Sequence, residues 1–149
     1  MRRLRSFKVV PQRLRQLAFE RSKGRCEYCL FPARLTNAPM HCEHIIPKSK
    51  GGTSSPENLA LACAWCNGFK GAKTHARDPK TGRLARLFNP RKDRWDRHFR
   101  WSDDLTRIEG LTAIGRATVE ALKLNRNELV QLRMLLLSIG EHPVQKSER

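Results

Sequence analysis

The sequence has 149 residues, with 30 lysines and arginines against 14 acidic residues and a formal net charge of +16. Hydrophobic residues make up 39%, which suits one modest core and excludes a large one. A surplus of positive charge this large repels itself in the folded state. It is typical of proteins with an anionic partner, of which nucleic acid is the commonest. The alternative is a solvated basic surface that only keeps the chain soluble.

Membrane insertion and secretion are not predicted. The sequence has no run of 18 apolar residues that would span a bilayer. The first residues, MRRLRSFKVVPQR, are basic but lack the apolar stretch of a secretory signal. We therefore expect an intracellular, cytoplasmic protein, in which a reducing environment disfavours disulfides among the five cysteines.

The N-terminal segment 1–24 reads as a basic arm followed by a helix. The arm covers 1–11, and a helix is predicted over 12–23 because Leu14, Leu17 and Ala18 fall on one face. Gly24 is a plausible stop. The motif CEYC then forms a tight knuckle, and 30–39 is predicted to be loop because it contains two prolines.

The middle of the chain contains two short apolar runs. MHCEHII, residues 40–46, is predicted to be a strand that ends at Pro47. KSKGGTSSPEN reads as a turn-rich loop, and LALAC is the second run. AWCNGFKGAK resembles a helix start, and HARDPKTGR is predicted to be loop.

Two helices are predicted near the C-terminus, over 111–124 and 125–140, from apolar residues at helical spacing. The expected apolar positions are Leu111, Ile114, Val119 and Leu122 in the first helix, and Leu129, Leu132, Leu136 and Ile139 in the second. Asn125 or Asn127 can cap the second helix, and Gly140 can end it. This helix can form the interface of a homodimer or cap the core, and both alternatives stay open.

Four of the five cysteines form two CxxC pairs, Cys26 with Cys29 and Cys63 with Cys66. Two such knuckles in a small intracellular protein are typical of a closed, structural four-cysteine zinc site. A redox pair or buried apolar cysteines are the alternatives, but a redox motif needs only one pair. Cys42 has no partner at this spacing and is interpreted as a packing residue.

A set of separated motifs spans residues 26–70. Glu43-His44-Ile-Ile-Pro is followed by Gly51-Gly52, by Asn58-Leu59 and by Cys63-x-x-Cys66-Asn67-x-x-Lys70. In this order and spacing the chain resembles the HNH endonuclease family. Asn67 stands at the third position of the family name, as in a known variant, and Glu43 stands where many members carry Asp.

The resemblance implies an α+β fold with a small ββα-metal core. Two short antiparallel strands, 40–46 and about 58–62, and a helix that begins near 64 would hold one divalent ion. The zinc site would staple this core. It would occupy 25–80, between the segment 1–24 and a basic, aromatic and helical extension over 81–149, all packed as one domain.

The resemblance also implies hydrolysis of DNA phosphodiester bonds. His44 would be the general base that activates water, and Glu43 and Asn67 would bind Mg²⁺ or Mn²⁺ through oxygen atoms. Asn58 would hold the loop between the strands, Lys70 would contact phosphate near the metal, and the two glycines would allow a sharp turn. Because neighbours on a regular strand point to opposite faces, Glu43 and His44 can share a site only if the strand ends or distorts there.

DNA is the expected partner, and RNA is less favoured. Candidate contacts to the DNA backbone lie in the core and in the extension: Lys48, Lys50, Lys70, Lys73, Arg91, Arg94, Arg97 and Arg100. The interleaved Trp95, Phe99 and Trp101 are expected to pack in the core, although they could also stack on bases. The alternative function is a zinc-ribbon module that binds nucleic acid without cutting it.

Overall fold

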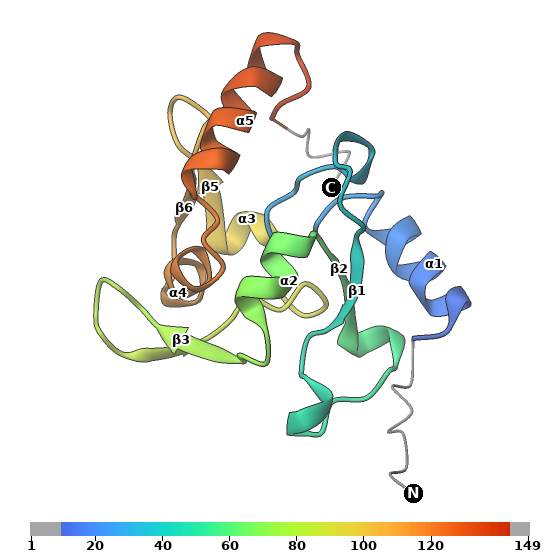
Figure 1. Cartoon of the computed structure of the whole chain (residues 1–149). Coiled ribbons are helices and arrows are strands. Elements are labelled where there is room, and N and C mark those ends of the chain that lie inside the picture. The colour runs from blue at the N-terminus through green and yellow to red at the C-terminus, as the bar shows by residue number, and fades with distance from the viewer. Residues whose placement is uncertain (1–9, 144–149) are drawn as a thin grey trace, which may run out of the picture.

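The fold is described from a computed structural model over residues 10–143 (Figure 1). The predicted basic arm lies almost wholly outside the described residues, as does the end of the chain from 144. The helices are α1 (Gln12–Arg21), α2 (Ala64–Lys70), α3 (Trp95–His98), α4 (Ala113–Ala121) and α5 (Asn127–Ser138). The strands are β1 (His41–His44), β2 (Leu59–Ala62), β3 (His75–Arg77), β4 (Leu84–Arg86), β5 (Phe99–Trp101) and β6 (Ile108–Gly110). The α+β class is confirmed.

The centre of the molecule is the β1–β2 hairpin with two helices packed against it. The strands are antiparallel, with Glu43 opposite Ala60 and His44 opposite Leu59. All four residues of β2 are buried. α1 packs on β2, and α2 packs on both strands, so the hairpin is covered as Figure 1 shows. The predicted order of strand, strand and helix is confirmed, with strand and helix ends that differ by one to two residues.

The loop between β1 and β2 is held by Asn58. Its side-chain oxygen accepts a hydrogen bond from the Ile46 amide at 2.8 Å, and its amide nitrogen donates to the Ile46 and Thr53 carbonyls at 2.9 and 2.8 Å. Gly51 has a φ of +85°, which favours glycine, and a Cβ on Gly52 would lie 1.7 Å from the Ile46 oxygen. The expected roles of Asn58 and of both glycines are thus supported by the geometry of this loop.

Two further hairpins follow α2, and neither is predicted from the sequence. The segment predicted to be loop forms the hairpin of β3 and β4, and the aromatic segment forms α3 and β5, which pairs with β6. Each strand has only three residues, too few to show an alternating pattern. Asp78 anchors the first hairpin to α4, because its carboxylate accepts two hydrogen bonds of 2.8 Å from Arg116.

One aromatic cluster joins the extension to the cysteine knuckle. The ring centroid of Phe88 lies 5.1 Å from Phe99 and 6.4 Å from Tyr28, both at edge-to-face angles. Trp95 packs on Phe99 and Trp101, and its indole N–H donates to the Tyr28 carbonyl at 3.2 Å. The prediction that the aromatic residues of the extension pack in the core is confirmed. The same core cluster also contains Leu87, Ile108, Leu122, Leu124 and Leu129.

Helix α5 differs from the prediction at its ends and on its buried face. Leu129 and Leu136 are buried as expected, but Ile139 is 63% exposed. Arg133 is buried instead, and its guanidinium donates to the carbonyls of Thr106 and Leu124. Burial lowers the pKa of Arg133 to about 10.

Neither predicted asparagine caps α5, because the N-cap residue is Arg126 and no side chain makes a capping hydrogen bond, but the predicted glycine at the other end is confirmed. The Asn125 side chain accepts a hydrogen bond from the backbone amide of Ile108 and donates one to the Ile108 carbonyl. It therefore binds the first residue of β6 instead of capping the helix. Gly140 does follow the helix end, with a φ of +73°. Within residues 10–143, no helix has both the length and the apolar character needed to cross a membrane.

Candidate functional site

The four paired cysteines meet in one buried cluster. Cys26 and Cys29 come from the knuckle that follows α1, while Cys63 and Cys66 lie at the N-terminus of α2. Their sulfur atoms all lie within 4.8 Å of one another. A tetrahedral zinc ion with Zn–S bonds of about 2.3 Å needs sulfur atoms about 3.8 Å apart. The Sγ atoms of Cys29 and Cys63 are 3.8 Å apart, so the cluster fits a closed zinc site.

Glu43 points into the core rather than toward solvent. It is only 6% exposed, its Oε2 lies 3.0 Å from the Lys70 ammonium, and its Oε1 accepts a hydrogen bond from the Tyr28 hydroxyl. Burial raises the pKa of Glu43, and Lys70 and Tyr28 oppose that rise by stabilising the charged carboxylate. Both carboxylate oxygens are therefore engaged by protein donors.

Lys70 is a buried structural cation. It is 1% exposed, and its ammonium donates to the Glu43 carboxylate and to the carbonyls of His44, at 3.2 Å, and Ile45, at 2.9 Å. Three acceptors match its three protons. The prediction that Lys70 contacts DNA phosphate is wrong for this structure, because no part of the ammonium is left for an outside anion. Instead, it ties the end of α2 to the end of β1.

His44 lies on the opposite face of β1 from Glu43. β1 ends at His44, but its pairing is regular up to that residue, so the two side chains still point to opposite faces. The His44 ring is partly exposed, and its Nε2 lies 2.9 Å from the Ser54 hydroxyl. Its pKa is lowered by partial burial and by the positive charges of Lys48 and Lys70.

Of the two predicted ligands for a catalytic ion, Glu43 does not fit this geometry, and the role of Asn67 stays a prediction. Glu43 is buried in its pair with Lys70, so it presents no free oxygen. Asn67 is partly exposed, and its side-chain amide makes no hydrogen bond to residues 10–143. Within that range the four cysteines are the only cluster of three or more histidine, cysteine or acidic side chains placed to hold a metal.

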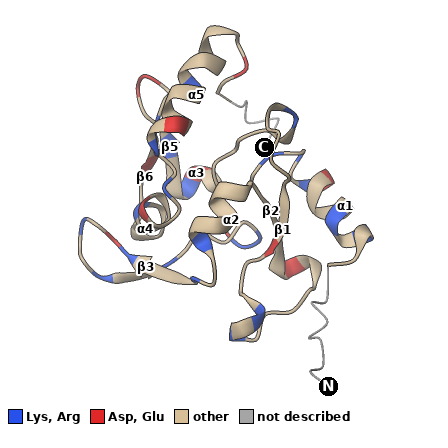
Figure 2. Ribbon diagram, in the orientation of Figure 1, with Lys and Arg blue, Asp and Glu red and all other residues tan. Residues whose placement is uncertain are grey.

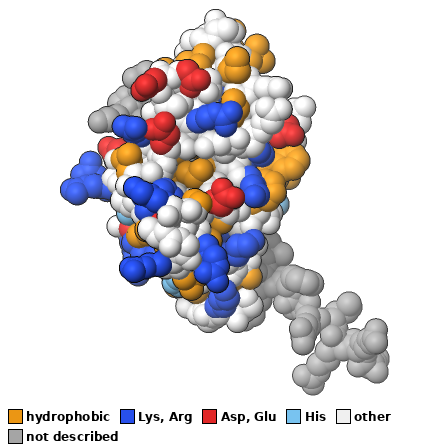
Figure 3. All heavy atoms as spheres, turned by 90° about the vertical axis from the view of Figure 1, so that its left-hand side faces the viewer, with side chains coloured by type: hydrophobic (Ala, Val, Ile, Leu, Met, Phe, Trp, Pro, Cys, Tyr) orange, Lys and Arg blue, Asp and Glu red, His pale blue; other side chains and the backbone are white. Residues whose placement is uncertain are grey.

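Three of the lysines predicted to bind DNA lie in exposed loops. Lys48 and Lys50 lie in the loop after β1, and Lys73 follows α2 (Figure 2). All three are exposed. Figure 3 shows the side that carries β3 and α4, where lysines and arginines occupy the lower half and acidic side chains lie mainly above them.

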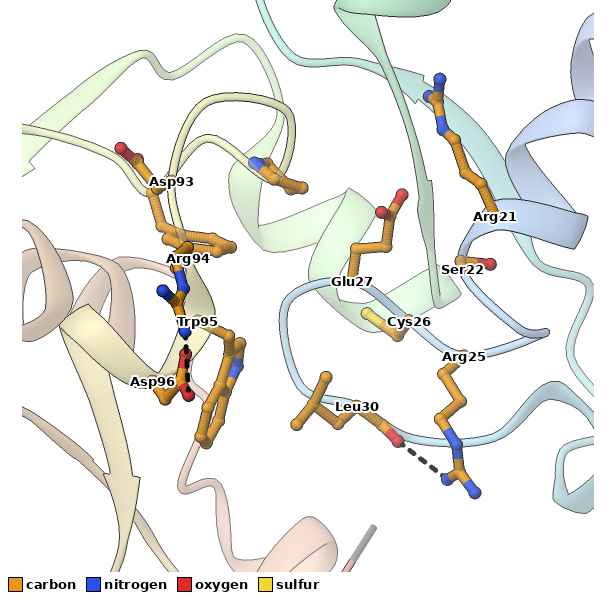
Figure 4. A pocket seen from close by; sticks show the side chains of 12 residues that line it. Arg21, Ser22, Arg25, Cys26, Glu27, Leu30, Asp93, Arg94, Trp95 and Asp96 are labelled. Atoms are coloured by element: carbon orange, nitrogen blue, oxygen red, sulfur yellow. Dashed lines mark hydrogen bonds and ion pairs between the residues drawn. The ribbon is translucent and has the colours of Figure 1, made fainter. Parts of the chain in front are cut away.

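The four arginines predicted to bind the DNA backbone differ in their surroundings. Arg91 is mostly buried and forms an ion pair with Glu27. Arg100 donates to Glu109 at 2.6 Å, and Arg94 lies 3.9 Å from Asp96 at the edge of a cavity of about 390 Å³ (Figure 4). That cavity also contains Asp93 and Glu27. Of these four arginines, only Arg97 is exposed and has no ion pair to any residue of 10–143. This surface is thus close to balanced in charge.

Two side chains of this site, Tyr28 and Ser54, are not predicted from the sequence. Tyr28 lies between the two cysteines of the first knuckle, where it looked like a spacer. A buried carboxylate needs hydrogen-bond donors, so the presence of Glu43 in an apolar strand indicates that a donor lies nearby. Ser54 carried no comparable signal, because serines are common in turn-rich loops.

The comparisons with known proteins agree with the motif pattern. The model of the family described as HNH endonuclease matches residues 26–73. No curated protein and no solved structure matches the chain. The matched segment contains all four cysteines of the cluster, together with Glu43, His44, Asn58, Asn67 and Lys70. Residues 26–73 are therefore similar to the HNH endonuclease family.

Proposed function

We propose that this protein is an endonuclease that hydrolyses DNA phosphodiester bonds, with His44 as the general base. The observation that carries the proposal is the setting of His44 within the matched segment. The side chain is partly exposed on the outer face of β1, and its lowered pKa keeps the imidazole neutral at pH 7. A neutral imidazole beside exposed lysines can take a proton from water next to a bound phosphate.

The two ring nitrogens of His44 have different roles in this proposal. In this proposal the Nε2–H donates to the Ser54 hydroxyl oxygen, which fixes the ring orientation and leaves the lone pair of Nδ1 free. Nδ1 is then the nitrogen left to take the proton as a water oxygen bonds to phosphorus and the bond to the 3′ oxygen breaks. The positive charge of Lys48, which acts on the imidazole, also favours an anionic substrate close to it.

A divalent ion, Mg²⁺ or Mn²⁺, stays part of the proposal as a requirement to be tested. We assign it no geometry, because the Glu43 carboxylate is engaged by Lys70 and Tyr28. The same observation favours a second candidate function. A zinc-stapled module that binds DNA without cutting it needs the buried Glu43–Lys70 pair only for its fold.

Plasmid cleavage by the purified protein separates the two functions. We expect nicking or cutting with Mg²⁺ or Mn²⁺ and none with EDTA. His44→Ala should lower the rate by about 10²- to 10⁴-fold, which is the usual contribution of a general base. His41→Ala, at the other end of β1, is the matched control and should cleave like the wild type.

Three outcomes are informative. Cleavage that survives His44→Ala would remove His44 from the catalytic role. If wild-type protein retards DNA on a gel but cleaves none with either metal, the binding module is the better description. If cleavage is unaffected by EDTA, the expected divalent ion is not needed.

The pH dependence of cleavage follows from the same histidine. Because its pKa lies below the ordinary value of 6.5, we expect kcat/KM to be constant from pH 7 to 8 and to fall only at more acidic pH. Below its pKa the imidazole carries a proton and cannot accept another. A rate profile from pH 5 to 8 checks this, and a profile that keeps rising above pH 7 would contradict it.

A further inference from the structure

A groove of about 450 Å³ opens beside the His44 end of β1. The residues that follow His44, Ile45 and Ile46, line one side of it. The opposite side is built by the β3–β4 hairpin and by the loop that contains Lys92. More than half of the residues that line the groove thus lie in 74–92, outside the segment matched by the HNH family.

The groove carries an uncompensated positive charge. Lys50, Lys73 and Lys92 line it and are exposed, and none of them has an ion pair within residues 10–143. The other two cations of the lining are already neutralised, Lys70 by Glu43 and Arg86 by two hydrogen bonds to Asp93 of 2.6 and 2.8 Å. No acidic residue lines the groove. An anion that enters it meets three lysine ammonium groups.

The lysine on the extension side is held by a well-defined loop. The Asn89 side-chain oxygen accepts hydrogen bonds from the backbone amides of Arg91, at 2.9 Å, and Lys92, at 3.3 Å. The backbone amide of Asn89 in turn donates to the Asp93 carboxylate at 2.9 Å. Lys92 therefore projects from a fixed turn, which reduces the entropy that a contact with phosphate would cost.

The groove does not suit unpaired bases. Its only ring apart from His75 is that of Phe88, which is 3% exposed and packs against Tyr28, His98 and Phe99. Single-stranded nucleic acid usually binds by stacking its bases on exposed aromatic rings. A duplex keeps its bases stacked inside and presents phosphates and sugars. The half-exposed Ile46 offers an apolar contact for a sugar, and the lysines offer contacts for phosphates.

We propose that this groove binds the backbone of duplex DNA next to the phosphate at which His44 acts, with Lys73 from the matched segment and Lys92 from the extension as its phosphate contacts. This inference rests on the proposed function for its choice of DNA. The extension thereby supplies part of the substrate-binding surface. The groove, rather than the charge-balanced surface of Arg94 and Arg100, is the main backbone contact.

The salt dependence of DNA binding tests the groove without relying on cleavage. The affinity of wild-type protein for a short DNA duplex is measured without added Mg²⁺ or Mn²⁺, from 50 to 300 mM salt. It is compared with Lys73→Gln/Lys92→Gln and with a matched control, Lys123→Gln/Arg107→Gln, which removes two exposed charges elsewhere. Each lost phosphate contact reduces the magnitude of the slope of log K against log[salt] by about 0.9. The slope of the groove variant should therefore be smaller in magnitude by about 1.8. With equal affinity at 1 M salt, this corresponds to about 30-fold weaker binding at 0.15 M salt.

The outcomes separate this inference from the nuclease proposal. If the groove variant loses slope and affinity while wild-type protein never cleaves, the groove stands and the nuclease proposal fails. If wild-type protein cleaves but the groove variant and the control bind equally, the groove is refuted and the nuclease proposal stands. Loss of binding to single strands or to duplex RNA, with duplex DNA unaffected, would refute the choice of duplex DNA. Unchanged zinc content and circular dichroism show that both variants are folded.

Discussion

Stripping the metal from the four-cysteine cluster should unfold the protein. The four buried sulfur atoms link the knuckle after α1 to the N-terminus of α2, and they lie within the larger core cluster. Zinc binding by small structural sites contributes about 10–16 kcal/mol at neutral pH. This free energy is as large as the usual free energy of unfolding of a whole domain, about 5–15 kcal/mol. We therefore expect the apoprotein to lose its cooperative thermal transition.

The measurement is a thermal melt by circular dichroism, with metal content determined in parallel. Cys66→Ser should bind less zinc and melt without cooperativity, as the chelated wild type does. Cys42→Ser is the matched control, since Cys42 lies outside the cluster and packs beside Val10, Leu14 and Leu59. It should keep one zinc ion per chain and a melting temperature close to that of the wild type. A cooperative melt of metal-free wild-type protein would show that the cluster is not needed for the fold.

Removing the Lys70 ammonium should destabilise the protein by about 3–5 kcal/mol, as is usual when one partner of a buried ion pair is lost. Lys70→Met keeps the length of the side chain but leaves three acceptors without their donor: the Glu43 carboxylate and the His44 and Ile45 carbonyls. Protonation of Glu43 relieves part of this cost, because burial already raises its pKa. The loss should therefore be larger at pH 8 than at pH 5.

Urea denaturation at the two pH values checks this expectation. Lys73→Met is the matched control, since Lys73 is exposed only three residues further along the chain. Adding Glu43→Gln to Lys70→Met should recover part of the stability, because it removes the buried charge that has lost its partner. Equal stability of the Lys70 and Lys73 variants would contradict the structural role of Lys70.

The motif-bearing half of the fold was predictable from the sequence. The CxxC spacing identified the metal cluster, and the strand–loop–strand–helix order followed from two apolar runs and the resemblance. Asn58 was given its loop-holding role for the same reason. These features depend on contacts that are local or fixed by a chelated ion, so a linear pattern can show them.

The chemistry of Glu43 and Lys70 was not predictable from their positions in the motif. The alternation of side chains on a strand already placed Glu43 and His44 on opposite faces. Which face is buried depends on α2, whose end brings Lys70 beneath β1, and on Tyr28 from the knuckle. Such a contact joins three segments, and no spacing rule connects them. The three-residue strands of the extension escaped prediction because they are short and partly exposed.

The aromatic cluster that joins the extension to the cysteine knuckle makes residues 26–73 dependent on the rest of the chain. The segment that can be recognised in other sequences ends at residue 73, but the core does not end there. Tyr28, whose hydroxyl holds Glu43, packs its ring on Phe88 and offers its carbonyl to Trp95. A recombination event that moved residues 26–73 alone into another protein would carry the motif and leave this support behind. The unit that folds is therefore larger than the segment that carries the motif.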